Sequence, residues 1–152
     1  MVKWYKYYMS AMLPLRYSMG IPDLDKQHQE LQESIHLIED MFSSGETDKI
    51  PAAIRQINIF LAAHFVDEER VMNEVQYPDS YTHVQDHSCI LLMLGEILLL
   101  PPEENSALIL YGLRMILRSH ILRYDVPMSY FVHNKESFNK TRFKSRTLKA
   151  LA

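Results

Sequence analysis

The stretch His83-Val84-Gln85-Asp86-His87 decides the fold, because it sets two histidines four residues apart in a segment rich in apolar residues. On an α-helix this spacing puts both imidazoles on one face, about one turn apart, where a single metal ion can contact both. The pair alone is a weak indication of a metal site. Two further pairs strengthen it: His64 with Glu68, also four apart, and His120 with Asp125.

Apolar residues recur at steps of three and four along four segments, which predicts four amphipathic helices that each turn one stripe toward a core. The stripes run over Leu24–Phe42, Ile54–Val75, His83–Ile97 and Leu110–Tyr124. Turn-forming residues separate them: Ser43-Ser44-Gly45, then Gln76-Tyr77-Pro78-Asp79, then Pro101-Pro102. We expect Asp79 or Ser80 to cap the third helix and the fourth to stop before Pro127.

Four helices of similar length joined by short loops predict an all-α fold, an antiparallel up-down-up-down four-helix bundle. We expect the bundle to occupy residues 13–126, between an N-terminal extension (1–12) and a C-terminal extension (127–152). Residues 1–19 hold Trp4 and four tyrosines without a clear period. This pattern predicts an irregular arm that packs aromatic rings on the bundle.

Composition favours a cytoplasmic protein of one domain: 152 residues, 47% of them apolar, with Cys89 as the single cysteine. A signal-peptide pattern is absent from the N-terminus, and Gly95 and Glu96 interrupt the longest apolar run, so we expect no membrane span. Residues 139–152 carry five of the sixteen Lys and Arg and no acid. The acidic remainder does not favour nucleic-acid binding, whereas the basic tail could bind a protein partner.

The predicted topology brings the chemistry-bearing residues together. His28 lies near the start of the first helix, and the pairs described above lie near the end of the second, the start of the third and the end of the fourth. In an up-down-up-down bundle these four helix ends are neighbours, so seven side chains should converge at one end of the core. The spacing of five between His120 and Asp125 requires either a local π-type turn or a fold-back of Asp125 from the helix end.

Counting donors indicates two metal ions. Five imidazoles and two carboxylates exceed the needs of one octahedral ion, but two bridging carboxylates could each give one oxygen to two ions. With one bridging solvent oxygen, an ion with three histidines reaches six ligands and an ion with two histidines reaches five, leaving one position open. Imidazole with carboxylate suits iron, zinc or copper, and the sequence does not choose between them.

Other polar and sulfur-containing residues have plainer expected roles. His36 and His133 should be solvated. Asp67, Glu69 and Asp86 lie off the helix stripes and should be ordinary surface charges. The residues expected to fill buried or half-buried space are Cys89, Met72, Met93 and Met115.

Five segments together resemble the hemerythrin family, in particular its bacterial members. They are Tyr17-Ser18-Met19-Gly20-Ile21, Asp25-Lys26-Gln27-His28, His64-Phe65-Val66-Asp67-Glu68-Glu69, His83 to His87, and His120-Ile121-Leu122-Arg123-Tyr124-Asp125. The resemblance covers about residues 13–126 and fills all seven positions of the family's ligand set. Two positions depart from the family pattern, since Leu13 and Ile116 stand where tryptophans are expected.

The resemblance implies a non-haem di-iron centre that binds dioxygen reversibly. His83, His87 and His120 would hold the six-coordinate iron, and His28 and His64 the five-coordinate one. An oxo or hydroxo group would join the irons, with Glu68 and Asp125 as the bridging carboxylates. Leu117 and Ile121 match family positions that line the dioxygen pocket.

Three functions follow from this resemblance, and the first is favoured. It is dioxygen binding for storage, delivery or sensing, without catalysis. The second is an oxygen or redox sensor that acts on a partner through residues 139–152. The third is an enzyme, either a di-iron oxidase or peroxidase or a protein that handles nitric oxide. The third is disfavoured because oxygen-activating bundles are rich in carboxylates, whereas histidines outnumber carboxylates five to two here.

Overall fold

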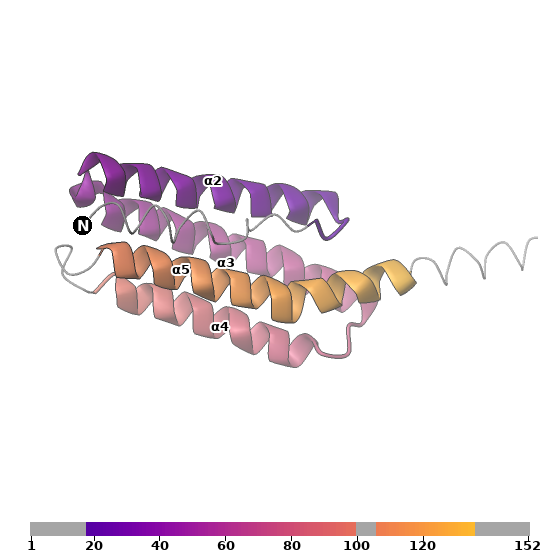
Figure 1. Ribbon diagram of the computed structural model, residues 1–152. Helices are drawn as coiled ribbons and strands as arrows, with labels where there is room; N and C mark the ends of the chain where they lie inside the picture. Colours follow the sequence, from indigo (N-terminus) through magenta and orange to yellow (C-terminus); the bar gives the residue numbers. More distant parts are fainter. Residues whose placement is uncertain (1–17, 100–105, 136–152) are drawn as a thin grey trace, which may run out of the picture.

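The computed structural model describes residues 18–99 and 106–135, and this part of the chain is helical, without strands. Its long helices are α2 (Pro22–Ser44), α3 (Ile50–Val75), α4 (Ser80–Ile97) and α5 (Ser106–His120). A 3-10 turn, η1 (Thr47–Lys49), precedes α3, and a π-helical segment, η2 (Ile121–Asp125), follows α5. The four long helices lie side by side (Figure 1), which confirms an all-α helical bundle.

The predicted breaks after α2 and α3 are confirmed, and both helices end at a residue with left-handed backbone, whereas the predicted break at Pro101-Pro102 lies outside the described residues. Gly45, with φ of 81°, ends α2, and its N–H bonds back to Met41 and Phe42 carbonyls. Gln76, with φ of 55°, ends α3. Asp79 occupies the N-cap position of α4, as predicted, although its side chain makes no capping hydrogen bond.

The predicted stop before Pro127 is also wrong. The helical backbone continues from η2 through residues 126–135, the yellow segment in Figure 1. A proline inside an ordinary helix would press its ring against a carbonyl of the preceding turn. Here the wider π turn ends directly before this point, and the Val126 N–H bonds to the Ile121 carbonyl. The widened backbone therefore makes room for Pro127.

Two apolar clusters fill the bundle interior. The larger extends along all four helices and includes Leu31, Leu61, Phe65, Ile90 and Leu117. The smaller consists of Met19, Leu24, Met72, Tyr77, Met128 and Val132. On α2, α3 and the α5–η2 segment, the polar residues of the predicted site occur between members of the two clusters. This order places the site between two layers that exclude water.

Three predicted fillers lie at the surface instead of in the core. Met93 and Met115 are each 40% exposed, and Cys89 is exposed. The predictions for these residues are wrong, because each lies beside a helix stripe rather than on it. Met72, in contrast, is buried as predicted.

Hydrogen bonds to the backbone N–H and to the carbonyl of Met19 hold the segment before α2 in place. Asp25 accepts hydrogen bonds from the Ser18 hydroxyl (2.9 Å) and from the backbone N–H groups of Met19 and Gly20. The Met19 carbonyl accepts hydrogen bonds from the Ser129 hydroxyl (2.9 Å) and from Nε2 of His133 (2.6 Å). His133 is exposed, as predicted, and its ring also binds the Met19 backbone.

Gly20 is required in this segment, because its φ of 67° is left-handed. A Cβ atom at this position would also lie only 2.5 Å from Nε2 of the His133 ring. Residues 1–17 of the predicted aromatic arm and the basic tail (residues 139–152) lie outside the described residues.

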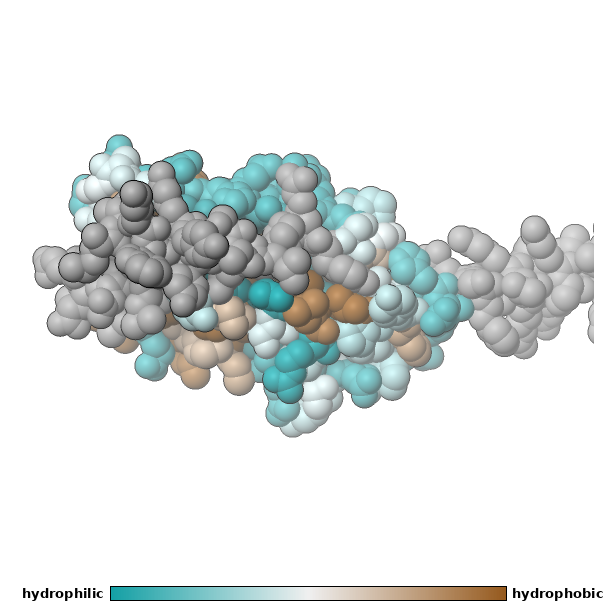
Figure 2. All heavy atoms as spheres, viewed as in Figure 1, coloured by the Kyte–Doolittle hydropathy of each residue, from teal (hydrophilic) through white to brown (hydrophobic). Residues whose placement is uncertain are grey.

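The described surface visible in Figure 2 is mainly hydrophilic, and its hydrophobic side chains gather in separate patches. No helix within residues 18–99 and 106–135 has both the length and the apolar character that a membrane span needs.

Candidate metal centre

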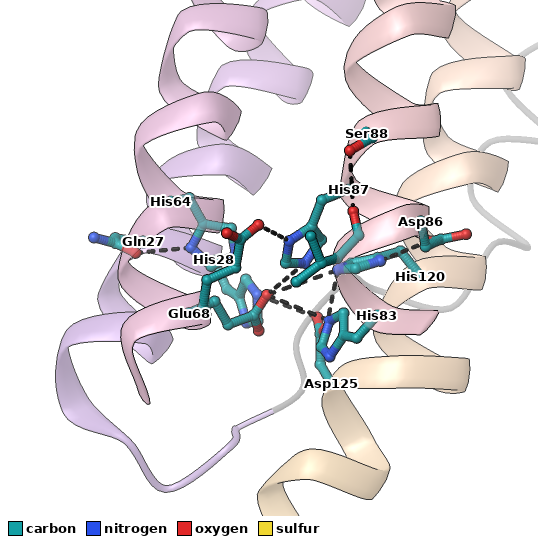
Figure 3. A network of polar contacts seen from close by, with 12 residues as sticks. Gln27, His28, His64, Glu68, His83, Asp86, His87, Ser88, His120 and Asp125 are labelled. Carbon is teal, nitrogen blue, oxygen red and sulfur yellow. Dashed lines mark hydrogen bonds and ion pairs between the residues drawn. The ribbon is translucent and has the colours of Figure 1, made fainter. Parts of the chain in front are cut away.

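Seven buried polar side chains converge at one end of the bundle, and each is at most 5% exposed. They come from the four long helices and from η2, as Figure 3 shows: His28 from α2, His64 and Glu68 from α3, His83 and His87 from α4, His120 from α5, and Asp125 from η2. These are the residues that the sequence predicts. Within the described part of the chain, the structure brings all seven into one site.

Glu68 lies at the centre of the site. Its Oε2 atom is 3.1 Å from Nε2 of His87, 3.5 Å from Nε2 of His83 and 3.8 Å from Nε2 of His120. Its carboxylate also groups closely with ring nitrogens of His28 and His64, all within 4.8 Å of one another. Glu68 thus lies close to two sets of histidines and could give one oxygen to each of two ions.

Asp125 takes a similar position on the other side. Its Oδ1 atom is 3.0 Å from Nε2 of His120 and 3.2 Å from Nε2 of His83. Its Oδ2 atom is 3.5 Å from Nε2 of His28. The π turn of η2 explains how residues five apart point into one site, and it confirms the first of the two predicted solutions.

Several of these atoms lack a satisfactory hydrogen bond. The buried atoms without one include Nε2 of His83 and His120, Oε1 of Glu68 and both carboxylate oxygens of Asp125. Leaving such groups unpaired in an apolar interior costs about 1–3 kcal/mol each. Nitrogen and carboxylate donors that face one another fit a metal cation, which would satisfy several of them at once.

The site strongly perturbs its own acid–base equilibria. Burial lowers the pKa of His64 to about 4. Burial also disfavours charge on His120, but the carboxylates of Asp125 and Glu68 close to its ring raise the pKa of His120 to about 11. Although burial favours a protonated Glu68, the imidazoles of His120, His83 and His87 close to its carboxylate hold the pKa of Glu68 well below its usual value.

We expect the metal-free protein to be most stable near pH 6.5, the ordinary pKa of a histidine side chain. His64 has a lowered pKa in the folded state, so its contribution is present above this pH and is lost as the pH falls toward 4. His120 has a raised pKa, so its contribution is complete below this pH and is lost as the pH rises toward 11.

Thermal unfolding with a chelator, at a series of pH values, checks this expectation. The melting temperature Tm should fall on both sides of the maximum, and the metal-loaded protein should show a flatter profile. A Tm of the metal-free protein that rises steadily from acid to alkaline pH would contradict it.

Three histidines are oriented by hydrogen bonds on their outer sides. Nδ1 of His64 donates to Oε1 of Gln27 at 2.7 Å, Nδ1 of His87 donates to Oε1 of Glu69 at 2.9 Å, and Nδ1 of His120 donates to Oδ2 of Asp86 at 2.8 Å. Each bond leaves Nε2 as the nitrogen available inside the site (Figure 3).

The sequence predictions missed these outer residues, and treating Glu69 and Asp86 as ordinary surface charges was wrong. Asp67 was mispredicted in the same way, because it accepts a hydrogen bond from Nε2 of Gln27 at 2.8 Å. A regular pattern could have revealed them. Gln27, Glu69 and Asp86 each adjoin a site residue in sequence, and each binds a histidine on the next helix along the chain.

Aromatic rings cover parts of the site. Phe65 is stacked on His87, with ring centroids 3.9 Å apart and an interplanar angle of 5°. Tyr124 lies against His83, with centroids 5.2 Å apart. Phe65 is buried and places an apolar wall next to the histidines.

Comparison with known proteins agrees with this geometry. The family model described as the hemerythrin HHE cation binding domain matches residues 19–125. This chain belongs to the hemerythrin family. The match contains all seven residues of the site.

Curated relatives include bacteriohemerythrins from two genera. The chain is 34% identical to the protein of Campylobacter jejuni subsp. jejuni serotype O:6 over 83 residues, which cover 54% of this chain and 62% of the relative. It is 29% identical to the protein of Pseudomonas paraeruginosa over 77 residues, covering 51% of this chain and 50% of the relative. The chain therefore matches less than two thirds of either relative's length. The comparison with solved structures found no significant match.

A cavity of about 250 Å³ lies between α4 and α5, beside this hemerythrin-type site. Its lining residues are Asp86, Ile90, Met93, Met115, Ile116, Ser119 and His120. Ile116 is one of the positions where the family pattern has a larger tryptophan. Leu117 and Ile121 do not line this cavity and are instead buried in the larger apolar cluster.

Proposed function

We propose that this protein holds two non-haem iron ions and binds dioxygen reversibly at one open iron position. The observation that carries the proposal is the convergence of five buried imidazoles and two buried carboxylates at one end of the bundle. Membership of the hemerythrin family supports it. Two ferrous ions would supply the electrons that bind dioxygen and would recover them when it leaves.

The proposed ligand roles follow the two groups of donors. His83, His87 and His120 would hold one iron, and they form a close group with Glu68. His28 and His64 would hold the other, and they form a second close group with the same carboxylate.

Glu68 and Asp125 would bridge the irons together with an oxo or hydroxo group. The contacts of Asp125 with His28 on one side, and with His83 and His120 on the other, support its bridging role. The two-histidine iron would keep the open position.

The protein's part in reversible binding is to orient the ligands and to exclude water. Leu117 and Ile121 are buried in the larger apolar cluster, on the two sides of His120 in sequence. We propose that they line the dioxygen pocket. Burial of charged intermediates is costly in such surroundings, which disfavours proton delivery and turnover.

We expect Leu117→Ala to speed irreversible oxidation of the iron centre in air without changing the iron content. The smaller side chain should admit water to the pocket. Leu113→Ala is the matched control, because Leu113 is equally buried in the same cluster. Each change should cost about 3 kcal/mol of unfolding free energy. Optical spectra recorded over time measure the oxidation, and equal oxidation rates for the two variants would move the pocket away from Leu117.

Dioxygen uptake by the reduced protein separates a binder from an enzyme. We expect one dioxygen per two irons, released again when the gas phase is exchanged for argon. Repeated consumption with an added reductant, without release, would instead indicate an oxidase or peroxidase. Nitric oxide consumed in place of dioxygen would indicate a nitric-oxide-handling enzyme.

Three further features belong to the same proposal. The up-down-up-down antiparallel order is supported by the meeting of residues from the start of α2, the end of α3, the start of α4 and the segment after α5. A cytoplasmic location is supported by the single cysteine. A protein partner for residues 139–152 stays a prediction, and removing these residues should abolish a sensor's output while sparing dioxygen binding.

A further inference from the structure

The groups that accept the outer hydrogen bonds of the histidines are charged on one side of the site and neutral on the other. On the side of the three-histidine iron, His87 and His120 donate directly to the carboxylates of Glu69 and Asp86, at 2.9 Å and 2.8 Å. On the side of the two-histidine iron, His64 donates to the neutral amide of Gln27 at 2.7 Å. The three bonds are of similar length, so the difference between them is chemical.

A second hydrogen bond holds Gln27 in this orientation. Its Nε2 donates to Oδ2 of Asp67 at 2.8 Å, which fixes Oε1 as the atom that faces His64. The negative charge of Asp67 is thereby kept one side chain further from the imidazole. The exposed guanidinium of Arg70, 3.7 Å from Oδ1 of Asp67, partly balances that charge.

The acceptor on Nδ1 changes how strongly an imidazole binds iron through Nε2. A carboxylate draws the Nδ1 proton toward itself, and the ring becomes a more basic ligand. A more basic ligand stabilises ferric over ferrous iron. A neutral amide has a weaker effect, because hydrogen bonds to charged acceptors are about twice as strong as neutral ones.

We propose that Gln27, held by Asp67, is a positioning residue that keeps His64 the weaker donor and so makes the two-histidine iron the harder one to oxidise. This inference rests on the proposed di-iron function. Its consequence is resistance to irreversible oxidation, in which one electron passes from a ferrous ion to dioxygen and the dioxygen leaves as superoxide. Gln27 thus favours release of intact dioxygen from the open position.

The double variant Gln27→Glu/Asp67→Asn tests the inference, because it exchanges acid and amide while keeping the net charge. Glu at position 27 can accept from His64 with one oxygen and from Asn at position 67 with the other. We expect the metal-loaded variant to keep two irons and to oxidise in air about tenfold faster. Its reduction potential should fall by about 59 mV. For a one-electron step, this shift corresponds to a tenfold change in the equilibrium constant for oxidation.

Asp86→Asn is the opposite change on the other side, where it replaces a carboxylate acceptor by an amide. We expect it to raise the reduction potential of the centre. Glu33→Gln is the control for the lost charge, because Glu33 is exposed on α2 and hydrogen-bonds to Gln29. Shifts of opposite sign in the double variant and in Asp86→Asn would separate a role in tuning the iron from a merely structural role.

The inference is overturned if the double variant holds two irons with an unchanged potential, or if both variants shift the potential in the same direction. If the double variant does not retain iron, the test rests on Asp86→Asn alone. In that case, a reduction potential of Asp86→Asn equal to that of Glu33→Gln overturns the inference. If the wild-type chain binds two irons and dioxygen but the variants do not shift the potential as expected, the inference fails and the proposed function stays intact. A wild-type chain that does not hold two irons overturns the function itself.

Discussion

Removing the metal from the purified protein should lower its Tm by roughly 10 °C. Seven buried polar side chains face one another in the site, and several of their atoms have no satisfactory hydrogen bond. A ligand present at a thousand times its Kd stabilises the folded state by about 4 kcal/mol. For a chain of this length, each kcal/mol corresponds to about 2–4 °C.

Calorimetry before and after anaerobic chelation, followed by reloading with ferrous iron, measures this effect. Reloading should restore the original Tm, which separates metal loss from damage to the protein. An equal Tm in the metal-free and loaded states would show that the buried histidines and carboxylates satisfy one another, and that the cluster is a structural network.

Replacing Glu68 by Ala should reduce the iron content from two ions to fewer than one per chain. Glu68 is the single residue that belongs to both groups of close donors found among the described residues. Its loss removes a ligand from each ion. It also leaves the neighbouring imidazoles without the carboxylate that faces them. Metal analysis after anaerobic loading gives the iron content, and circular dichroism checks that the helices persist.

Glu74→Ala is the matched control for this variant. Glu74 lies on the same helix, but its side chain is 62% exposed and pairs with Arg70 at the surface. The control should keep both irons. A Glu68→Ala protein that also keeps both would show that Glu68 does not bridge them.

Much of the fold could be predicted because helix periodicity is a local property of the sequence. The breaks at Gly45 and Gln76 and the buried stripes follow directly from residue type and spacing. The convergence of the seven site residues was also predictable, since short loops leave few ways to arrange four helices. The awkward spacing of His120 and Asp125 left two solutions, a π turn or a fold-back of Asp125, and the structure has the π turn.

Contacts between helices were harder to predict. Gln27, Glu69 and Asp86 lie off the stripes of their own helices, and their role appears only when the neighbouring helix supplies a histidine. The helix beyond Pro127 was missed because the widened backbone at η2 changes what a proline does there.

The measurement that tests the central claim most directly is the iron content of the purified protein, recorded with optical spectra of its reduced, dioxygen-treated and oxidised states. The proposal predicts two irons per chain and a spectrum that changes with dioxygen and reverts when dioxygen is removed. One zinc ion per chain, with no iron taken up after anaerobic loading, would contradict it.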